Sequence, residues 1–287
     1  MSSNLLLKCR WLFPALLAFA VGCADDDGDG QTALGPDLPT GPGRVYAVEP
    51  VAFTTVDGIA VSASFGRLPQ TAAAGPAVIL IHDLGSAAAS GEWLLSGLFE
   101  EMLERGYQPL ALDLRAHGAT PAPNDGRSAP QLLFSDLDDL HLDVRAAVGW
   151  LKSQSRVDAG RIAVVGNGAG GNVAYVSVGA YAADIGAGVA LSPGLWESTT
   201  QDPLVIGDGI DPFRPHTMLY LVGADDYLTV PSSSETLSYA GFATALATLT
   251  QEPKTLTVYD GVSAHGLDLL SDAAVVSQLF SWLDANL

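Results

Sequence analysis

Cysteine and basic residues are both scarce in this sequence. Its 287 residues include two cysteines, and 13 Lys plus Arg stand against 32 Asp plus Glu. The formal net charge of −19 argues against nucleic acid as a partner, because phosphate backbones are bound by basic patches. It also disfavours adhesion to anionic lipid surfaces. One cysteine, Cys9, lies within residues 1–22, which we expect to be removed as a signal peptide. We therefore expect no disulfide within the folded part of the chain.

Long apolar runs are equally rare. The first, Trp11 to Val21, follows Lys8 and Arg10 and is too short to span a bilayer as a stable helix. A basic start, an apolar middle and small residues after it describe a secretory signal peptide. No second long apolar run follows, so we expect no other segment to cross a membrane.

The second cysteine stands where such a signal would be cut. The segment Ala20-Val21-Gly22-Cys23 resembles a bacterial lipoprotein cleavage site, at which the thiol is lipidated and becomes the new N-terminus. The resemblance implies an exported protein that is anchored in the cell envelope through Cys23. The alternative is a plain secreted protein that is cleaved near Ala24.

The residues after the signal are unsuited to folding. Residues 24–44 are rich in Asp, Gly and Pro and carry little apolar surface, which is typical of a flexible tether. We therefore divide the chain into a lipoprotein signal peptide (1–22), a flexible acidic linker (23–44) and one folded domain (45–287). The last of these is long enough to bury a substantial core.

Strand and helix patterns alternate along the domain. A hairpin signal, Asp57-Gly58, separates two strands within 45–68. Further strands are expected at 77–82, 109–113, 162–165, 187–192, 217–223 and 255–261, and helices at 93–106, 139–154, 236–249 and 273–287, with another after 166–170. Repeated β-α units imply a mostly parallel sheet covered by helices on both faces. Ligands of such sheets lie at the carboxyl ends of the strands.

Six short motifs overlap or follow the ends of the expected strands. They are ILIHDLGSAAASGEW (79–93), ALDLRAHGAT (111–120), GNGAG (166–170), LSPG (191–194), LVGADD (221–226) and AHGLDLL (264–270). In this order they resemble the α/β-hydrolase family, closest to its dienelactone hydrolase-like branch. The resemblance implies an α/β-hydrolase fold with a twisted, mostly parallel sheet and an N-terminal hairpin. It implies an ester, lactone or acyl compound as ligand and no cofactor.

The family's nucleophile stands at the centre of a G-x-S-x-G turn between a strand and a helix. Here the turn reads Gly166-Asn167-Gly168-Ala169-Gly170, so glycine occupies the serine position. Glycine has no hydroxyl to lose a proton and attack a carbonyl. Ser177 lies about two helical turns further on and cannot replace it. The usual acyl-enzyme route is therefore closed.

The acid and the base of the family's triad have candidates in the expected places. The resemblance points to Asp226, three residues after Gly223, with the neighbouring Asp225 as the less favoured choice, and to His265 after the last strand. A buried carboxylate would fix the tautomer of this histidine and stabilise its cation.

No spacing of His, Cys, Asp or Glu residues in the sequence supports a metal site.

The oxyanion hole is open to two readings. Its donors would be the backbone N–H of Ala169 and, by resemblance, that of Leu84. Asp83 stands where the family usually has glycine. A carboxylate pointing inward there would disfavour a developing oxyanion, whereas one pointing outward would be harmless.

A long irregular segment, 193–216, joins two expected strands. Loops of this length often form lids or binding walls, and Trp196 and Phe213 would then form an apolar wall of the substrate pocket. Packing of the segment against the sheet edge is an equal alternative.

Three functional hypotheses follow. The favoured one is a pseudo-hydrolase that binds a small acyl compound or a partner. The second is an ester or lactone hydrolase with weak or altered chemistry, in which His265 and Asp226 activate a water in the space of the absent hydroxyl. The third is an error at one codon, by which serine was recorded as Gly168.

Overall fold

The computed structural model describes residues 47–67, 73–83, 86–128, 131–132, 137–195, 214–229 and 235–287. These residues form an eight-stranded sheet with the order β1-β2-β4-β3-β5-β6-β7-β10 and a two-stranded ribbon, β8-β9. Strands β1 and β2 form an antiparallel hairpin, β2 pairs with β4 antiparallel, and every later pair in the large sheet is parallel. This is the α/β-hydrolase arrangement that the sequence predicts, with its hairpin at the start.

The strands of the large sheet are β1 (Ala47–Thr54), β2 (Ala60–Arg67), β3 (Gly75–Ile81), β4 (Gln108–Leu112), β5 (Val157–Asn167), β6 (Ala187–Leu191), β7 (His216–Gly223) and β10 (Gln251–Tyr259). All residues of β4 and β6 are buried, as are nearly all of β3 and β7. Such strands read as continuous apolar runs in the sequence because helices cover both of their faces.

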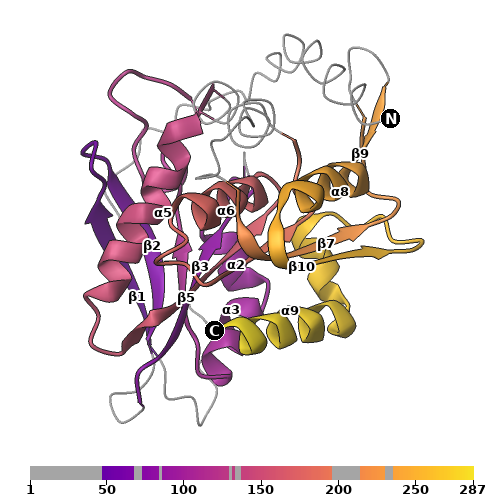
Figure 1. Ribbon diagram of the computed structural model, residues 1–287. Helices are drawn as coiled ribbons and strands as arrows, with labels where there is room; N and C mark the ends of the chain where they lie inside the picture. Colours follow the sequence, from indigo (N-terminus) through magenta and orange to yellow (C-terminus); the bar gives the residue numbers. More distant parts are fainter. Residues whose placement is uncertain are drawn as a thin grey trace.

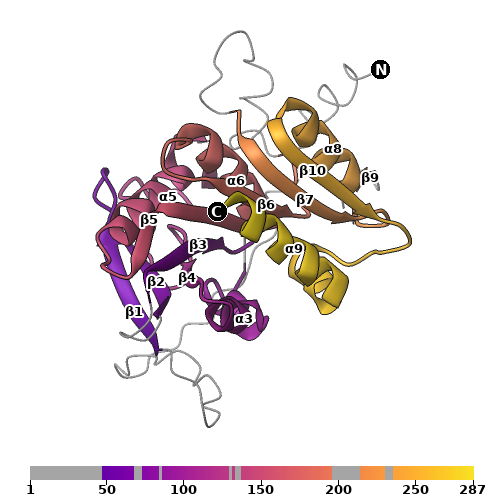
Figure 2. The ribbon, with the colours of Figure 1, turned by 60° about the horizontal axis from the view of Figure 1, so that its bottom comes forward.

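Helices cover the sheet on its two faces (Figures 1 and 2). On one face lie α5 (Leu137–Lys152), α6 (Ala169–Ala180) and α8 (Tyr239–Leu249), and their apolar residues share one core cluster with the strands. On the other lie α2 (Gly91–Leu95), α3 (Leu98–Glu104) and α9 (Ala273–Asn286), which share the second cluster. Within the described part of the chain, no helix is long and apolar enough to cross a membrane.

Some element boundaries differ from the sequence predictions. The single helix expected at 93–106 is two helices, α2 and α3, because Gly97 adopts a left-handed φ of 78° between them. The helix expected at 236–249 begins only at Tyr239, where Ser238 caps it by accepting a hydrogen bond from the N–H of Gly241. The three residues before it form β9 (Thr236–Ser238), which pairs with the unexpected β8 (Tyr227–Thr229).

The parallel pairing places the polar motifs at one edge of the sheet. The carboxyl ends of β3, β5, β7 and β10 lead into Asp83, Gly168, Asp226 and His265, respectively. Since parallel strands end at the same edge, four segments far apart in the sequence meet there. The candidate site follows from this arrangement.

Candidate functional site

The turn between β5 and α6 has the backbone shape of a nucleophile elbow. Gly168 has φ 52° and ψ −118°, a conformation that side chains rarely adopt. Its N–H donates to the carbonyl of Leu191 on β6, at 2.9 Å. Close packing also requires glycine at 170, where a Cβ would lie 2.4 Å from the carbonyl oxygen of Ile81. The sequence of the turn therefore fits its tight approach to β3.

The side chain of Asp83 points inward, toward the turn at Gly168. Its Oδ1 accepts a hydrogen bond of 2.7 Å from the backbone N–H of Ala169. A Cβ built on Gly168 would lie 2.3 Å from that same oxygen and 2.4 Å from the carboxyl carbon. The Asp83 carboxylate thus fills the space of a side chain at 168 and takes the N–H that the resemblance assigns to the oxyanion hole. Of the two readings of Asp83, the inward one holds.

His265 and Asp226 meet across the loops that follow β10 and β7. The Nδ1–H of His265 donates to the Asp226 carboxylate, with Nδ1 at 2.9 Å from Oδ2 and 3.1 Å from Oδ1. Asp226 is buried, whereas the alternative acid, Asp225, is exposed. The side chain of His265 is 34% exposed, so molecules from solvent can reach it.

The electrostatics of this pair favour a protonated imidazole. Burial alone lowers the pKa of His265, but the hydrogen bond and charge of Asp226, followed by the charge of Asp83, outweigh burial and raise it. The ring of Tyr239 lies 4.4 Å from the imidazole, centroid to centroid. Burial, and then the charges of Asp83 and Asp226, raise the pKa of Tyr239. These four side chains share one electrostatic environment.

Two polar side chains that sequence reasoning did not assign to the site connect its loops. Glu92 of α2 accepts hydrogen bonds from the Asp83 N–H at 3.1 Å and from the Asn167 amide at 2.9 Å. The amide oxygen of Asn167 accepts from the N–H of Leu267, at 3.0 Å, in the segment after His265. Burial raises the pKa of Glu92, despite the hydrogen bonds from Asn167 and Asp83. The only sequence signal was an acid inside an apolar helix start, GEWLL.

A third supporting residue lies after β6. Ser192 is buried, and its hydroxyl accepts a hydrogen bond of 3.0 Å from the N–H of Gly266. It fixes the start of the 3₁₀ helix η4 (Gly266–Ser271), which His265 precedes. The LSPG motif therefore supports the histidine loop.

The polar side chains of the loop after β4 make hydrogen bonds and ion pairs within the fold. The carboxylate of Asp113 accepts from the N–H groups of Ser90 and Ala119, at 2.9 Å each. The Arg115 guanidinium is fully buried between Asp143, at 2.7 Å, and Asp57, at 2.8 Å. Each polar group thus stabilises the fold beside the site.

The remaining sequence-predicted residues lie outside the described part of the chain. They are Cys23, Leu84, Trp196 and Phe213. Among the described residues, no group of three or more His, Cys, Asp or Glu side chains has the arrangement of a metal site.

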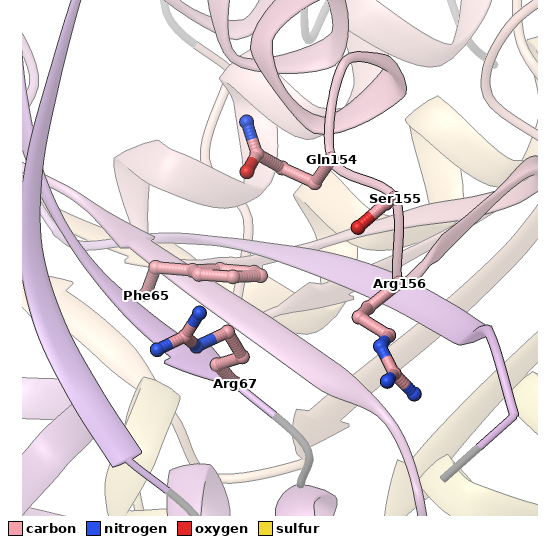
Figure 3. A pocket seen from close by; sticks show the side chains of 5 residues that line it. All are labelled: Phe65, Arg67, Gln154, Ser155 and Arg156. Carbon is pink, nitrogen blue, oxygen red and sulfur yellow. The ribbon is translucent and has the colours of Figure 1, made fainter. Parts of the chain in front are cut away.

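A cavity of about 200 Å³ lies away from these residues (Figure 3). Phe65 and Arg67 of β2 line it, together with Gln154, Ser155 and Arg156 between α5 and β5. Arg67 is already paired with Glu49, and the amino end of β5 is the opposite edge of the sheet from Gly168. The cavity is therefore separate from the candidate site.

Comparison with known proteins agrees with this architecture. Residues 78–282 match the model of the Alpha/beta hydrolase family, and the chain belongs to this family. No curated protein sequence matches the chain.

Solved structures with this fold include hydrolases from several organisms. An esterase of Pyrococcus furiosus has a TM-score of 0.60 and 20% identity, covering 84% of this chain and 93% of its own. A dienelactone hydrolase of Anabaena variabilis has a TM-score of 0.59 and 16% identity, covering 85% of this chain and 100% of its own. Acetyl xylan esterase 1 of a Thermoanaerobacterium species has a TM-score of 0.60 and 18% identity, covering 86% and 85%. At such identities the likeness concerns the fold.

Proposed function

We propose that this protein is a pseudo-hydrolase of the dienelactone hydrolase-like type, which does not cleave esters or lactones through an acyl-enzyme. One observation carries the proposal: the carboxylate of Asp83 occupies both the side-chain space of residue 168 and the N–H of Ala169. Acyl transfer requires a nucleophile in the side-chain space of residue 168. It also requires the N–H of Ala169 to be free to donate to the oxyanion. Both requirements fail at the same point.

A serine at 168 would require Asp83 to move. Its Cβ would lie 2.3 Å from Oδ1 and 2.4 Å from the carboxyl carbon of Asp83. Resequencing the codon of residue 168 tests the remaining hypothesis, an error by which serine was recorded as glycine.

The polar side chains beside Gly168 are suited to binding a small molecule. His265 and Asp226 form a polar pair that solvent can reach, beside the ring of Tyr239. Small-molecule sites in proteins fix their ligand with a few precisely placed polar groups. We therefore infer that the site takes a small ester, lactone or acyl compound as a ligand.

The test is an ester and lactone panel with the wild-type protein. We expect no turnover above buffer and no labelling by a fluorophosphonate probe. Turnover that persists in His216→Ala but vanishes in His265→Ala would overturn the proposal. His216 is a suitable control because it lies at the opposite end of β7.

The retained pair supports a second candidate function, a slow ester or lactone hydrolase. In it His265, oriented by Asp226 at 2.9 Å, would activate a water molecule directly. Without a nucleophile, such sites keep roughly 10³–10⁴-fold catalysis over water. Slow turnover that is detected in a sensitive assay and lost in His265→Ala would favour this function, provided that there is no kinetic burst and no labelling of the enzyme by the fluorophosphonate.

We further propose that the protein is exported and lipid-anchored in a bacterial envelope through Cys23, so that only its N-terminus contacts a membrane. The support is the basic, apolar and small-residue order that ends at Cys23. Expression with labelled palmitate tests this. Label and membrane fractionation should both be lost in Cys23→Ser; an unlabelled wild-type protein in the soluble fraction would instead indicate plain secretion.

A further inference from the structure

We propose that the cavity at the opposite edge of the sheet is a second ligand site, which binds a small carboxylate that also carries a hydroxyl group. The proposal goes beyond the pseudo-hydrolase function and does not depend on it, because the cavity shares no residue with the candidate site. It is carried by the side chains that surround about 200 Å³ of space between β2 and the start of β5.

Backbone and ring contacts fix the walls of this cavity. The carbonyl of Arg156 accepts a hydrogen bond of 2.9 Å from the N–H of Gly75, the first residue of β3, and another from the buried side chain of Gln108 on β4. Phe65 forms the apolar wall, and the edge contact with Trp150, at 5.0 Å between ring centroids, holds its ring. Walls that are already ordered lower the cost of binding a ligand.

Arg67 and Arg156 form the cationic side of the cavity. Only 13 Lys and Arg occur in this acidic chain, and two of them meet at this one cavity. Within the described part of the chain, the guanidinium of Arg67 bonds to Glu49 alone, through Nη2. Its remaining N–H groups are therefore available to a ligand. Guanidinium groups bind carboxylates through paired N–H donors, so an anion is the suitable ligand for this side.

Gln154 and Ser155 form the neutral side. The amide nitrogen of Gln154 donates to the carbonyl of Trp150, at 3.2 Å, and to the hydroxyl oxygen of Ser153, at 3.0 Å. Figure 3 shows the amide oxygen of Gln154 on the side of Phe65, with the hydroxyl of Ser155 pointing toward the same space. An amide oxygen accepts from a hydroxyl group but offers nothing to a carboxylate. This side therefore matches a ligand hydroxyl.

Charge and volume narrow the class of ligand further. Arg67, Arg156 and Glu49 together carry a charge of +1, which suits one carboxylate better than a phosphate group of about −1.5 to −2. A volume of about 200 Å³ corresponds to roughly seven water molecules at ~30 Å³ each. The site therefore takes a short hydroxy acid rather than a long-chain or polymeric anion.

The first experiment titrates the full chain with lactate and follows the backbone amide resonances of Ser155 and Arg156. We expect saturable shifts in the wild type. Arg67→Gln should weaken binding by roughly two- to fivefold, the usual range for a partly exposed ion pair. Glu49→Gln should strengthen it by a similar factor, because Arg67 then loses its competing partner. A gain in affinity cannot come from a failure to fold.

A matched pair of controls lies on α3. Arg105 and Glu101 form an ion pair with side chains 43% and 37% exposed, close to the 41% and 40% of Arg67 and Glu49. Arg105→Gln and Glu101→Gln should leave lactate binding unchanged. Absence of saturable shifts in the wild type would overturn the proposal. So would equal affinities in the wild type, Arg67→Gln and Glu49→Gln.

The second experiment tests recognition of the hydroxyl group with propionate, which is lactate without its hydroxyl. We expect lactate to bind about two- to tenfold more tightly, the worth of one neutral hydrogen bond. In Gln154→Leu this preference should disappear while propionate binds as before. Equal binding of the two acids by the wild type, or inorganic phosphate binding more tightly than lactate, would overturn the assignment of a hydroxy acid.

His265→Ala separates this site from the candidate site. Lactate should shift the Ser155 and Arg156 resonances of that variant as in the wild type, because His265 lies at the other edge of the sheet. Loss of these shifts in His265→Ala would overturn the second site. Ester turnover by the wild type would contradict the pseudo-hydrolase proposal and leave this one standing.

Discussion

The carboxylate of Asp83 and the backbone of Gly168 occupy complementary space: a Cβ at 168 would lie 2.3 Å from Oδ1 and 2.7 Å from Oδ2 of Asp83. The two residues are 85 positions apart along the chain and come from the ends of β3 and β5, which are neighbours in the sheet. The identity of one residue therefore limits what the other can be. Stability and activity at these two positions should be coupled.

The first prediction concerns this coupling in stability. Gly168→Ser places a side chain at φ 52°, which costs about 1–3 kcal/mol. The carboxylate must also swing away and lose the Ala169 N–H, which adds about 1–3 kcal/mol for a hydrogen bond to a charged group. In an Asp83→Gly background the second cost disappears.

Urea unfolding of the two single variants and the double variant measures this. We expect the double variant to be more stable than the sum of the single effects, by about 0.5–3 kcal/mol. Strict additivity would mean that the two side chains do not compete for the same space.

The second prediction concerns gain of function. Gly168→Ser alone should remain inactive on esters, because Asp83 still competes for the site and for the Ala169 N–H. With Asp83→Gly as well, the hydroxyl of Ser at position 168 has space. His265, hydrogen-bonded to Asp226, would then act as its general base. The double variant should therefore react with a fluorophosphonate and hydrolyse short p-nitrophenyl esters. A single Gly168→Ser variant as active as the double one would show that Asp83 is no obstacle.

Much of the fold was predictable from the sequence, because buried parallel strands read as apolar runs and end at polar or glycine-rich turns. The sheet, its hairpin and its two helical faces are confirmed. The break between α2 and α3 was missed, since one glycine within an apolar helical pattern does not by itself end a helix. The chain order likewise indicated Asp226 and His265, which the structure brings together.

The interior of the site was less predictable, for a physical reason. Whether Asp83 points inward depends on the space that Gly168 leaves and on the hydrogen bond from Ala169. The bond between Asn167 and Glu92 likewise joins residues 75 positions apart. Such contacts are set by how loops pack, and local sequence patterns carry no information on this.

The third prediction tests the network that joins the site loops. Asn167→Ala removes the amide that donates to Glu92 at 2.9 Å and accepts from Leu267 at 3.0 Å. The Leu267 N–H is left without its acceptor and the half-buried Glu92 carboxylate without one of its donors, so we expect a loss of about 1–3 kcal/mol in unfolding free energy. Hydrogen exchange should also quicken in the segment after His265.

A matched variant is available for that experiment. The amide of Asn286 donates to the carbonyl of Trp282 near the end of α9, at 2.8 Å and at a partly exposed position. Asn286→Ala should therefore cost well under 1 kcal/mol, in the usual range for surface substitutions. Equal losses in the two variants would indicate that the Asn167 network contributes nothing special.

The fourth prediction is a pH dependence of stability that belongs to His82. Burial first, and then the charge of His117, lower the pKa of His82 from 6.5 to about 4. Its hydrogen bonds require the neutral ring: Nδ1 donates to the Asp83 carbonyl at 2.7 Å, and Nε2 accepts from the Leu114 N–H at 3.1 Å. A proton on Nε2 would oppose that N–H. The folded protein therefore resists protonation at a pH where the unfolded chain accepts it.

The direction of this pH dependence follows from the protons that His82 binds in the folded and unfolded states. Between pH 6.5 and about 4 the unfolded chain binds more protons at this residue, so its contribution to stability is present above that window and is lost as the pH falls through it. A shift of this size corresponds to at most about 3 kcal/mol. His82→Gln keeps an acceptor for the Leu114 N–H but has no group that titrates. The difference in unfolding free energy between wild type and His82→Gln should shrink on acidification, while titrating groups that do not interact with His82 cancel. A difference that stays constant across this window would show that His82 is protonated equally in both states.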